Sequence, residues 1–261
     1  MSPPQPSAAA QAFWDELRRT TQSRIGLGRS GDALPTRRVL EFRAAHAAAR
    51  DAVHLPLDVA ALTERVDAAG LGAAVHVRSR ARDRAEYLRR PDLGRLPADG
   101  ALTPIPHSGA DIGFVLADGL SPRALAEHGT KTLDALVDEL APRYRLAAPV
   151  IATQSRVALG DHIAAAMGVA TVVVLIGERP GLSVADSLGI YLTHLPRPGR
   201  TDADRNCVSN IHPPEGLGYR EAAKVVAGLV AGARLLGRSG VDLKDTSRSD
   251  AIGPGAVISI E

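Results

Sequence analysis

The polar residues best placed to hold a ligand follow an apolar run in the second half of the chain. Residues 171–176 are β-branched or aliphatic throughout, and the sequence Gly-Glu-Arg-Pro-Gly follows at 177–181. Its glycines allow a tight turn that a bulky ligand can approach, and Glu178 offers a hydrogen-bond acceptor. A purely structural turn with solvated charges explains the glycines equally well. We favour a ligand-binding turn and keep the structural turn as the alternative.

A second polar segment contains the single cysteine, Cys207. This thiol could act as a nucleophile with His212 as its base, but residues five apart in sequence rarely present the two groups correctly. We therefore interpret Cys207 as a thiol that is buried or lines a ligand site. A single cysteine excludes an internal disulfide and a zinc site built from several thiolates, and it favours a reducing, intracellular compartment.

Other short motifs carry less weight. The pattern Gly-x-Gly-x-x-Gly at 26–31, with Asp51 twenty residues beyond it, matches the dinucleotide-binding fingerprint. No apolar strand precedes it, so we interpret it as a chance match. His54 could share a helical edge with Asp51 and Asp58, but Pro56 interrupts that helix, which argues against a metal site. We expect neither a metal ligand nor a catalytic residue in this chain.

The composition excludes two classes of partner. Aromatic residues make up only 3% of the chain and the net charge is +2, so neither a stacking platform nor a strongly basic face is available for nucleic acid. The arginine-rich stretch at 78–95 is interleaved with acids, which is typical of a solvated or subunit-contacting face. No apolar run reaches the ~18 residues that a membrane span requires. We expect a soluble, cytoplasmic protein that binds neither nucleic acid nor a membrane.

A sheet covered by helices is the predicted architecture. The run at 171–176 does not alternate, which is typical of a strand covered on both faces, so we place it at the centre of the sheet. We predict an α/β fold with a Rossmann-like, mostly parallel sheet flanked by helices, and with an N-terminal helical subdomain. Strands are predicted at 75–77, 112–117, 148–153, 171–176 and 189–193. Helices are predicted at 37–50 with Thr36 as cap, after Asp58, after Ser121 with Pro122 first, at 161–167 and at 222–236.

Shifts in composition divide the chain into four predicted parts. Residues 1–12 form a disordered lead, and residues 13–109 form a helical region that ends in a connector rich in proline and glycine. Residues 110–244 form the Rossmann-like domain, and residues 245–261 form a loose tail.

Ligands of open α/β sheets bind beyond the carboxyl ends of the strands, where the loops diverge. The loops that follow three of the predicted strands should therefore lie at one rim of the sheet. They comprise residues 118–120, 154–160 and 177–181.

Eight segments of the chain are considered together: Leu-Pro-Thr-Arg at 34–37, Ala-Arg-Asp-Ala-Val at 49–53, Tyr-Leu-Arg-Arg-Pro-Asp-Leu-Gly-Arg at 87–95, Ala-Asp-Gly-Leu-Ser at 117–121, Arg-Val-Ala-Leu-Gly-Asp at 156–161, Leu-Ile-Gly-Glu-Arg-Pro-Gly at 175–181, Arg-Thr-Asp-Ala-Asp-Arg-Asn-Cys-Val-Ser-Asn-Ile at 200–211 and Ser-Gly-Val-Asp-Leu-Lys at 239–244. In this order and spacing they resemble the ethanolamine ammonia-lyase small-subunit family. The resemblance extends from about Leu17 to Lys244 and is more specific than any short motif.

The resemblance implies an enzyme that releases acetaldehyde and ammonia from ethanolamine by a radical mechanism with adenosylcobalamin. A larger partner, a TIM barrel, would hold the substrate, and this chain would help to bind the cobalamin at the interface without being active alone. Carried over residue by residue, the family's cofactor contacts fall on Val157, Glu178 and Cys207, with Arg156 as a weaker candidate. Glu178 would accept hydrogen bonds from corrin amides, while Val157 and Cys207 would make apolar or backbone contacts.

The same resemblance implies a large hetero-oligomer with the ethanolamine ammonia-lyase large subunit. Some relatives carry an N-terminal extension linked to packaging in a bacterial microcompartment, and the short N-terminus here argues against such packaging. The alternative is a free-standing Rossmann-like module that binds cobalamin or a nucleotide without lyase activity. A nicotinamide oxidoreductase is a more distant alternative.

Overall fold

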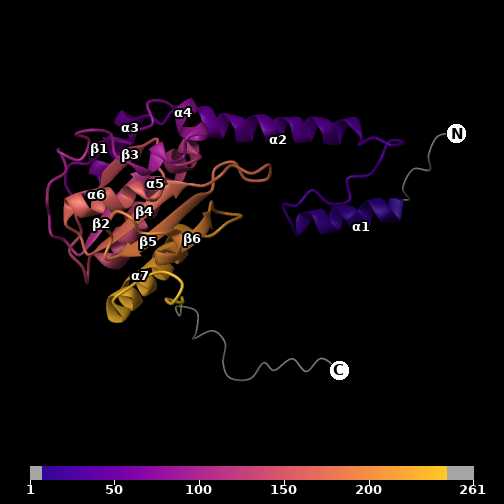
Figure 1. The fold of residues 1–261 in the computed structure, drawn as a ribbon. Coiled ribbons are helices and arrows are strands. Elements are labelled where there is room, and N and C mark those ends of the chain that lie inside the picture. Colours follow the sequence, from indigo (N-terminus) through magenta and orange to yellow (C-terminus); the bar gives the residue numbers. More distant parts are fainter. Residues whose placement is uncertain (1–7, 246–261) are drawn as a thin grey trace, which may run out of the picture.

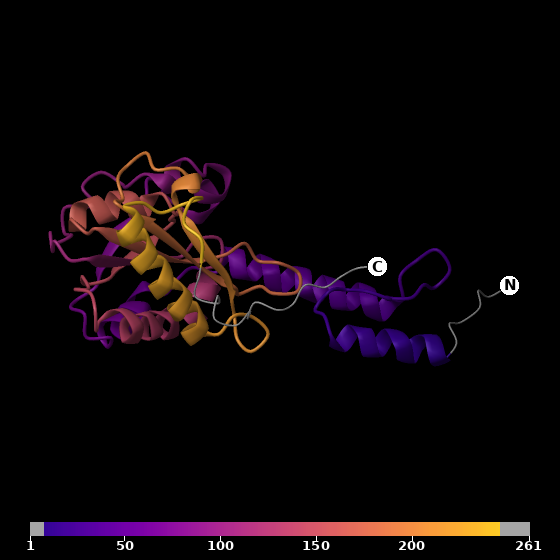
Figure 2. The same cartoon turned by 90° about the horizontal axis from the view of Figure 1, so that it is seen from below.

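The computed structural model describes residues 8–245, which form a six-stranded sheet covered by helices and a helical arm that projects from it (Figure 1; Figure 2). The strands are β1 (Val75–Arg78), β2 (Ile112–Ala117), β3 (Val150–Thr153), β4 (Thr171–Gly177), β5 (Leu188–His194) and β6 (Asn206–Ile211). The helices are α1 (Ala8–Arg19), α2 (Thr36–His54), α3 (Val59–Asp67), α4 (Arg84–Arg89), α5 (Pro122–Leu140), α6 (Leu159–Met167) and α7 (Tyr219–Leu236), with short 3-10 turns at Leu93–Arg95 and Asp202–Asp204. The order of the strands across the sheet is β1-β3-β2-β4-β5-β6.

The parallel part of the sheet consists of β1, β3, β2 and β4. Every residue of β2 and β4 is buried, because helices cover both faces of these two central strands. One apolar cluster lies on the side of α5 and α7, and a second lies on the side of α6. The prediction that residues 171–176 form the central strand is therefore confirmed.

The remaining two strands are antiparallel to their neighbours. The predicted strand at 189–193 is present as β5, but it forms a hairpin with β4 because residues 178–187 are too few for a crossover to a parallel neighbour. β6 pairs with β5 and was not predicted. The segment is rich in polar residues, which are uncommon in a strand covered on both faces. In the structure Cys207 is exposed and Val208 is buried, so only one face of β6 is covered. The fold is thus α/β with a mostly parallel sheet, and its closer assignment as Rossmann-like stays a prediction.

Most helix ends follow the predicted chemistry. Ser121 accepts a hydrogen bond from the Ala124 N–H at 3.2 Å, and Pro122 is the first residue of α5. Asp58 caps α3 in the same way, and Gly168 ends α6 in the left-handed conformation with a φ of 68°. These caps fix where α3, α5 and α6 begin or end beside the sheet.

Thr36 was predicted to cap the second helix, and this prediction is wrong. Thr36 is the first residue of α2, and Pro35 occupies the cap position without a side-chain hydrogen bond. Proline has no hydroxyl to offer, but its fixed φ suits the residue that leads into a helix. The helix also continues past residue 50 to His54, as far as the segment around Pro56 allows.

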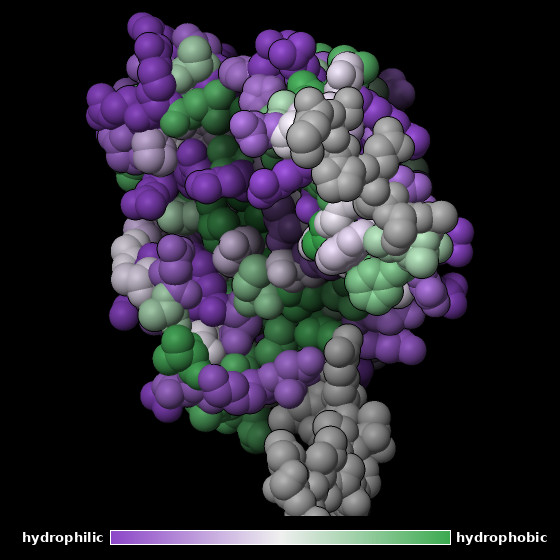
Figure 3. Space-filling view, turned by 90° about the vertical axis from the view of Figure 1, so that its right-hand side faces the viewer, coloured by the Kyte–Doolittle hydropathy of each residue, from purple (hydrophilic) through white to green (hydrophobic). Residues whose placement is uncertain are grey.

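Helices α1 and α2 form an arm that reaches away from the sheet (Figure 1; Figure 2). Viewed from the side to which the arm projects, the surface is hollowed at its centre, where recessed apolar side chains lie between hydrophilic ones (Figure 3). The Gly-x-Gly-x-x-Gly pattern lies in the loop between α1 and α2 and follows a helix instead of a strand, which agrees with a chance match. No helix within residues 8–245 has the length and apolarity needed to cross a bilayer.

The predicted division of the chain agrees with the structure only in part. α1 begins at Ala8, so residues 8–12, which were assigned to a disordered lead, are helical. The predicted tail lies outside the described residues except for Asp245. The division at 109/110 stays a prediction: β1 lies before it, yet β1 pairs with β3, and Leu62 of α3 joins the core on the α5 side.

Candidate functional site

The three loops predicted to share a rim do lie together at the carboxyl ends of β2, β3 and β4. Asp118 follows β2, and its two carboxylate oxygens accept hydrogen bonds from the N–H groups of Gln154 and Ser155 at 2.8 and 2.9 Å. The Leu120 N–H donates to the Gly177 carbonyl at 2.9 Å. Hydrogen bonds therefore join the loop after β2 to the loops after β3 and β4.

The part of the sheet beside this rim is covered on one side only. α7 contacts β5 and β6 on the face where Ile190 and Val208 are buried. On the opposite face α6 contacts β2 and β4, while Tyr191 of β5 is only partly buried and Cys207 of β6 is exposed. We call this surface, formed by Tyr191, Cys207 and the side chain of Glu178, the open half-face.

Glu178 reaches the open half-face from the first residue after β4. Its Oε2 atom accepts a hydrogen bond from Ser187 Oγ at 2.6 Å and a longer one from the Asn210 N–H at 3.4 Å. Its Oε1 atom lies above Gly189, because a Cβ built on that glycine would be only 2.8 Å from it. Gly189 therefore provides the space that the carboxylate occupies, and one carboxylate oxygen is directed by the protein while the other faces the half-face.

Cys207 is not arranged as a nucleophile. Its pKa is raised above the usual value, mainly because the thiol is partly shielded from water although the residue as a whole is exposed; a hydrogen bond with Tyr191 opposes the shift, and Glu178 adds to it. A thiol with a raised pKa stays protonated and unreactive at neutral pH. The ring of His212, the base considered from the sequence, is instead paired with Asn210 Oδ1 at 2.8 Å. Cys207 is exposed, so it is not a buried thiol, and its interpretation as a residue that lines a ligand site stays a prediction.

Val157 lies just before α6 and packs, partly buried, on the same apolar cluster as Tyr191. Three residues further on, Gly160 allows α6 to sit against the sheet, since a Cβ there would approach Val174 Cγ2 to 2.6 Å. Arg156 points elsewhere: its guanidinium lies 4.5 Å from the centre of the Tyr87 ring. Val157 thus shares its supporting cluster with the open half-face, whereas the side chain of the weaker candidate, Arg156, lies against Tyr87.

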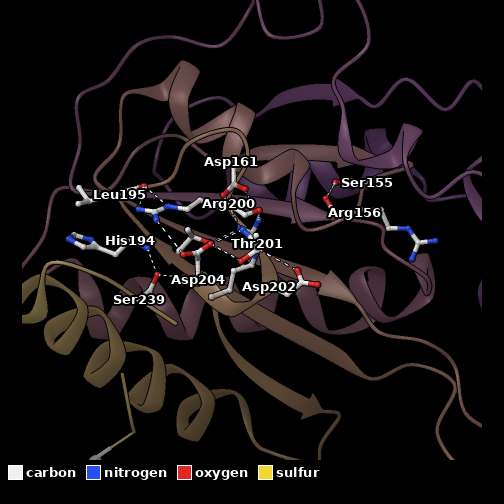
Figure 4. A network of polar contacts seen from close by, with 12 residues as sticks. Ser155, Arg156, Asp161, His194, Leu195, Arg200, Thr201, Asp202, Asp204 and Ser239 are labelled. Atoms are coloured by element: carbon white, nitrogen blue, oxygen red, sulfur yellow. Dashed lines mark hydrogen bonds and ion pairs between the residues drawn. The ribbon is translucent and has the colours of Figure 1, made fainter. Parts of the chain in front are cut away.

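A buried ion pair ties α6 to β6. Both oxygens of Asp161, in the first turn of α6, bind the guanidinium of Arg205 at 2.6 and 2.9 Å, and both side chains are only 1% exposed (Figure 4). Arg205 also donates to Thr193 Oγ1 of β5 at 2.8 Å and to the Arg200 carbonyl at 3.0 Å. Because Val157 lies just before α6 and Cys207 is the second residue of β6, this pair helps to fix the distance between two of the predicted contacts.

The segment at 239–244 has a structural role next to the same strand. Asn206 donates to the carbonyls of Gly240 and Leu243 at 3.1 and 3.0 Å and accepts from the Gly240 N–H at 2.7 Å. Ser239 Oγ donates to the Asp204 carbonyl at 2.6 Å and accepts from the His194 N–H (Figure 4). The chain after α7 is therefore clamped to the start of β6.

The sequence predicted three cofactor contacts but did not indicate the residues that connect them in the structure. Glu178 and Cys207 lie close enough for Glu178 to raise the pKa of the thiol, and Val157 packs on the cluster that supports the half-face. Tyr191 was not singled out, although a lone aromatic residue in an aliphatic strand is a visible signal. The pairing of Asp161 with Arg205, by contrast, could not be predicted, because the two residues are 44 positions apart in the sequence.

The two glycines of the turn at 177–181 differ in what they touch, which yields a prediction. A Cβ on Gly177 would lie 2.0 Å from the Ser121 carbonyl oxygen, whereas a Cβ on Gly181 would lie 3.4 Å from that of Val184. We expect Gly177→Ala to lower the free energy of unfolding by about 1–3 kcal/mol, because backbone must move to admit the methyl group. Gly181→Ala should change it by less than about 0.5 kcal/mol. Denaturant unfolding of the two variants side by side measures the difference, and equal effects would contradict the contact.

The fold and this surface define a mixed-sheet α/β protein in which the chain's own helices leave half of one sheet face open. Comparison with known families is more specific. The family model described as "Ethanolamine ammonia-lyase light chain" matches residues 11–244, and the chain belongs to this family. A relative from Rhodococcus erythropolis, named ethanolamine ammonia-lyase small subunit, is 71% identical over 249 residues, which cover 95% of this chain and 96% of the relative.

Two further relatives carry the same name. The protein of Rhodopseudomonas palustris (strain BisA53) is 50% identical over 241 residues, covering 90% of this chain and 91% of the relative. That of Ralstonia nicotianae (strain ATCC BAA-1114 / GMI1000) is 47% identical over 249 residues, covering 93% and 92%. The resemblance seen in the sequence is therefore confirmed at the level of the family.

Proposed function

We propose that the chain is the small subunit of an adenosylcobalamin-dependent ethanolamine ammonia-lyase, which converts ethanolamine to acetaldehyde and ammonia together with a large subunit. Its part in that enzyme is to help hold the cobalamin where the two subunits meet. The observation that carries this proposal is the open half-face, where Glu178 and Cys207 lie together with Tyr191, which packs on the same apolar cluster as Val157. Membership of the family supplies the name of the reaction.

The residues of the half-face fit a corrin. A corrin is a broad, flat macrocycle whose rim carries neutral amides, so its site needs an uncharged surface with a few hydrogen-bonding groups. β5 and β6 offer such a surface: the Cys207 thiol is protonated, and the Tyr191 ring packs on an apolar cluster. Glu178 Oε1, held above Gly189, can accept a hydrogen bond from an amide NH2 group. An exposed cysteine beside a partly buried aromatic ring agrees with a site completed by another chain.

In this proposal the chain itself positions the cofactor and carries out no bond-making or bond-breaking step. When bound, adenosylcobalamin supplies the radical that starts the reaction. Glu178 would orient the corrin through its amide, Val157 and Cys207 would shield it from water, and the Asp161–Arg205 pair would keep these contacts in register. Within residues 8–245, the hydrogen bonds that the Glu178 carboxylate accepts from Ser187 and Asn210 hold its side chain in place. We therefore assign it a binding role and no part in proton transfer.

Co-expression tests the proposal directly. The chain should copurify with an ethanolamine ammonia-lyase large subunit, and the pair should release acetaldehyde from ethanolamine only when adenosylcobalamin is added. Neither chain alone should do so. A complex that forms but gives no cobalamin-dependent acetaldehyde, or a chain that binds a nicotinamide tightly by itself, would contradict the proposal and favour one of the alternatives.

The role of Glu178 leads to a further prediction. In the assembled complex, Glu178→Ala should raise the dissociation constant for cobalamin about 10- to 100-fold, because a charged acceptor is lost. Glu178→Gln should cost less, since its amide oxygen still accepts. A spectroscopic titration with cyanocobalamin measures both. The matched control is Glu64→Gln on the exposed surface of α3, which should leave the dissociation constant unchanged. Equal binding by all four proteins would exclude Glu178 from the site.

A further inference from the structure

Tyr191 stands at the centre of the open half-face. In the register of the sheet it is opposite Cys207 on β6 and opposite Val174 on β4. Its ring is only partly buried and packs on the apolar cluster that Val157 also contacts. Each of the three predicted contact residues is thus a neighbour of this one side chain or of the cluster on which it rests.

The surroundings keep the phenol in its neutral form. Burial raises the pKa of Tyr191 to about 12, and the nearby Cys207 and Glu178 contribute in the same direction. The hydroxyl is therefore a hydrogen-bond donor throughout the physiological pH range. It lies beside a carboxylate, Glu178, that acts only as an acceptor.

A purely structural tyrosine looks different in this molecule. Tyr87 is completely buried, and its hydroxyl donates to the Ser155 carbonyl at 2.9 Å. Tyr191 instead leaves part of its ring in solvent, and the side-chain partner of its hydroxyl is the Cys207 thiol, a weak hydrogen-bonding group. An aromatic side chain with one apolar face and one polar tip is well suited to a ligand surface.

We propose that Tyr191 is a further cobalamin contact, in which its ring supports the edge of the macrocycle and its hydroxyl donates a hydrogen bond to the carbonyl of a corrin amide. A primary amide offers an NH2 donor and a carbonyl acceptor. Glu178 provides the acceptor for the first and Tyr191 the donor for the second. Together they favour neutral amide side chains over carboxylates, which Glu178 would repel. This inference rests on the proposed function, since it deepens the same site.

The test uses the complex of this chain with the large subunit and cyanocobalamin as the probe. Tyr191→Phe keeps the ring and removes the donor, so the dissociation constant should rise about 5- to 10-fold. Tyr191→Ala removes both and should raise it about 30-fold or more. The apparent KM for ethanolamine should stay within twofold of the wild-type value, because the substrate lies elsewhere. Tyr144→Phe is the control, since Tyr144 lies against Arg234, away from the half-face.

The possible outcomes separate the two claims. If Glu178→Ala weakens cobalamin binding while both Tyr191 variants bind as the wild type does, Tyr191 is not a contact and the proposed function stands. If the wild-type complex itself binds no cobalamin, the proposed function fails and the inference fails with it. If Tyr191→Ala does not assemble, the phenylalanine variant decides alone: unchanged binding overturns the inference, and weaker binding with an unchanged melting temperature supports it.

Discussion

Replacement of Asp161 by alanine is expected to lower the free energy of unfolding by about 3–5 kcal/mol, the largest single effect predicted for this chain. The carboxylate and the Arg205 guanidinium are joined by two hydrogen bonds of 2.6 and 2.9 Å, and each side chain is 1% exposed. Removal of one partner leaves the other charge buried without compensation. The measurement is equilibrium unfolding in denaturant, with the midpoint and slope compared between wild type and variant.

A second variant shows where the loss originates. The double substitution Asp161→Leu/Arg205→Met removes both charges and leaves apolar side chains, so it should recover much of the stability lost by Asp161→Ala. The control is the pair Arg238–Asp242, which lies 3.2 Å apart with side chains 59% and 56% exposed. Asp242→Ala should cost less than about 1 kcal/mol because solvent screens that pair. A loss at Asp161 no larger than at Asp242 would contradict the role assigned to the buried pair.

The stability of the protein is also expected to depend on pH through Asp118. This residue is 2% exposed, and burial raises the pKa of its carboxyl from 3.8 to about 6, against the opposing effects of the Ser155 and Gln154 N–H groups and of Arg84 at 3.6 Å. The folded protein therefore holds this proton more tightly than the unfolded chain does. Its contribution to stability is complete below about pH 4 and is lost as the pH rises through 6.

The size of this effect follows from the shift. A difference of about two pKa units corresponds to roughly 3 kcal/mol between pH 4 and pH 7. We expect the unfolding free energy of the wild type minus that of Asp118→Asn to fall by on the order of this amount across the range. The subtraction cancels other titrating groups, and a constant cost of the asparagine shifts the difference equally at every pH, so it does not alter the expected fall. A difference that stays flat or rises with pH would place the folded pKa at or below its unfolded value.

The functional consequence of Asp118 is local. Its carboxylate fixes the loop after β3, in which Gln154 takes a positive φ of 53° and leads to Val157. A non-glycine residue in this conformation is strained and persists only where its neighbours hold it. The same variant should therefore loosen the approach to α6, which hydrogen exchange of the loop amides would detect.

Much of the fold could be predicted from local chemistry. Strands β2 and β4 are unbroken apolar runs, and runs of this kind are stable only when both faces are covered. Ser121 and Asp58 have the side chains that cap helices, and the structure uses them in that way. These patterns involve only a few consecutive residues, so they can be recognised in the sequence without knowledge of the rest of the structure.

The elements that were missed or wrongly predicted are those whose structure depends on other segments of the chain. β6 contains both polar and apolar residues because α7 covers only one of its faces, and the sequence does not show which helix will lie there. The direction of β5 depended on the absence of a helix after β4. The same argument applies to Thr36, which has the chemistry of a cap but follows a proline that already sets the entry into α2.

The sequence by itself determined the family, the central strands and the position along the chain of Val157, Glu178 and Cys207. The tertiary structure alone decided that Glu178 and Cys207 share one open half-face with Tyr191 between them, and that Asp161 and Arg205 hold its two sides together. The reason is physical: covalent neighbours fix helix caps and strand propensity over a few residues. A surface or a buried ion pair exists only when segments far apart in sequence exclude water together.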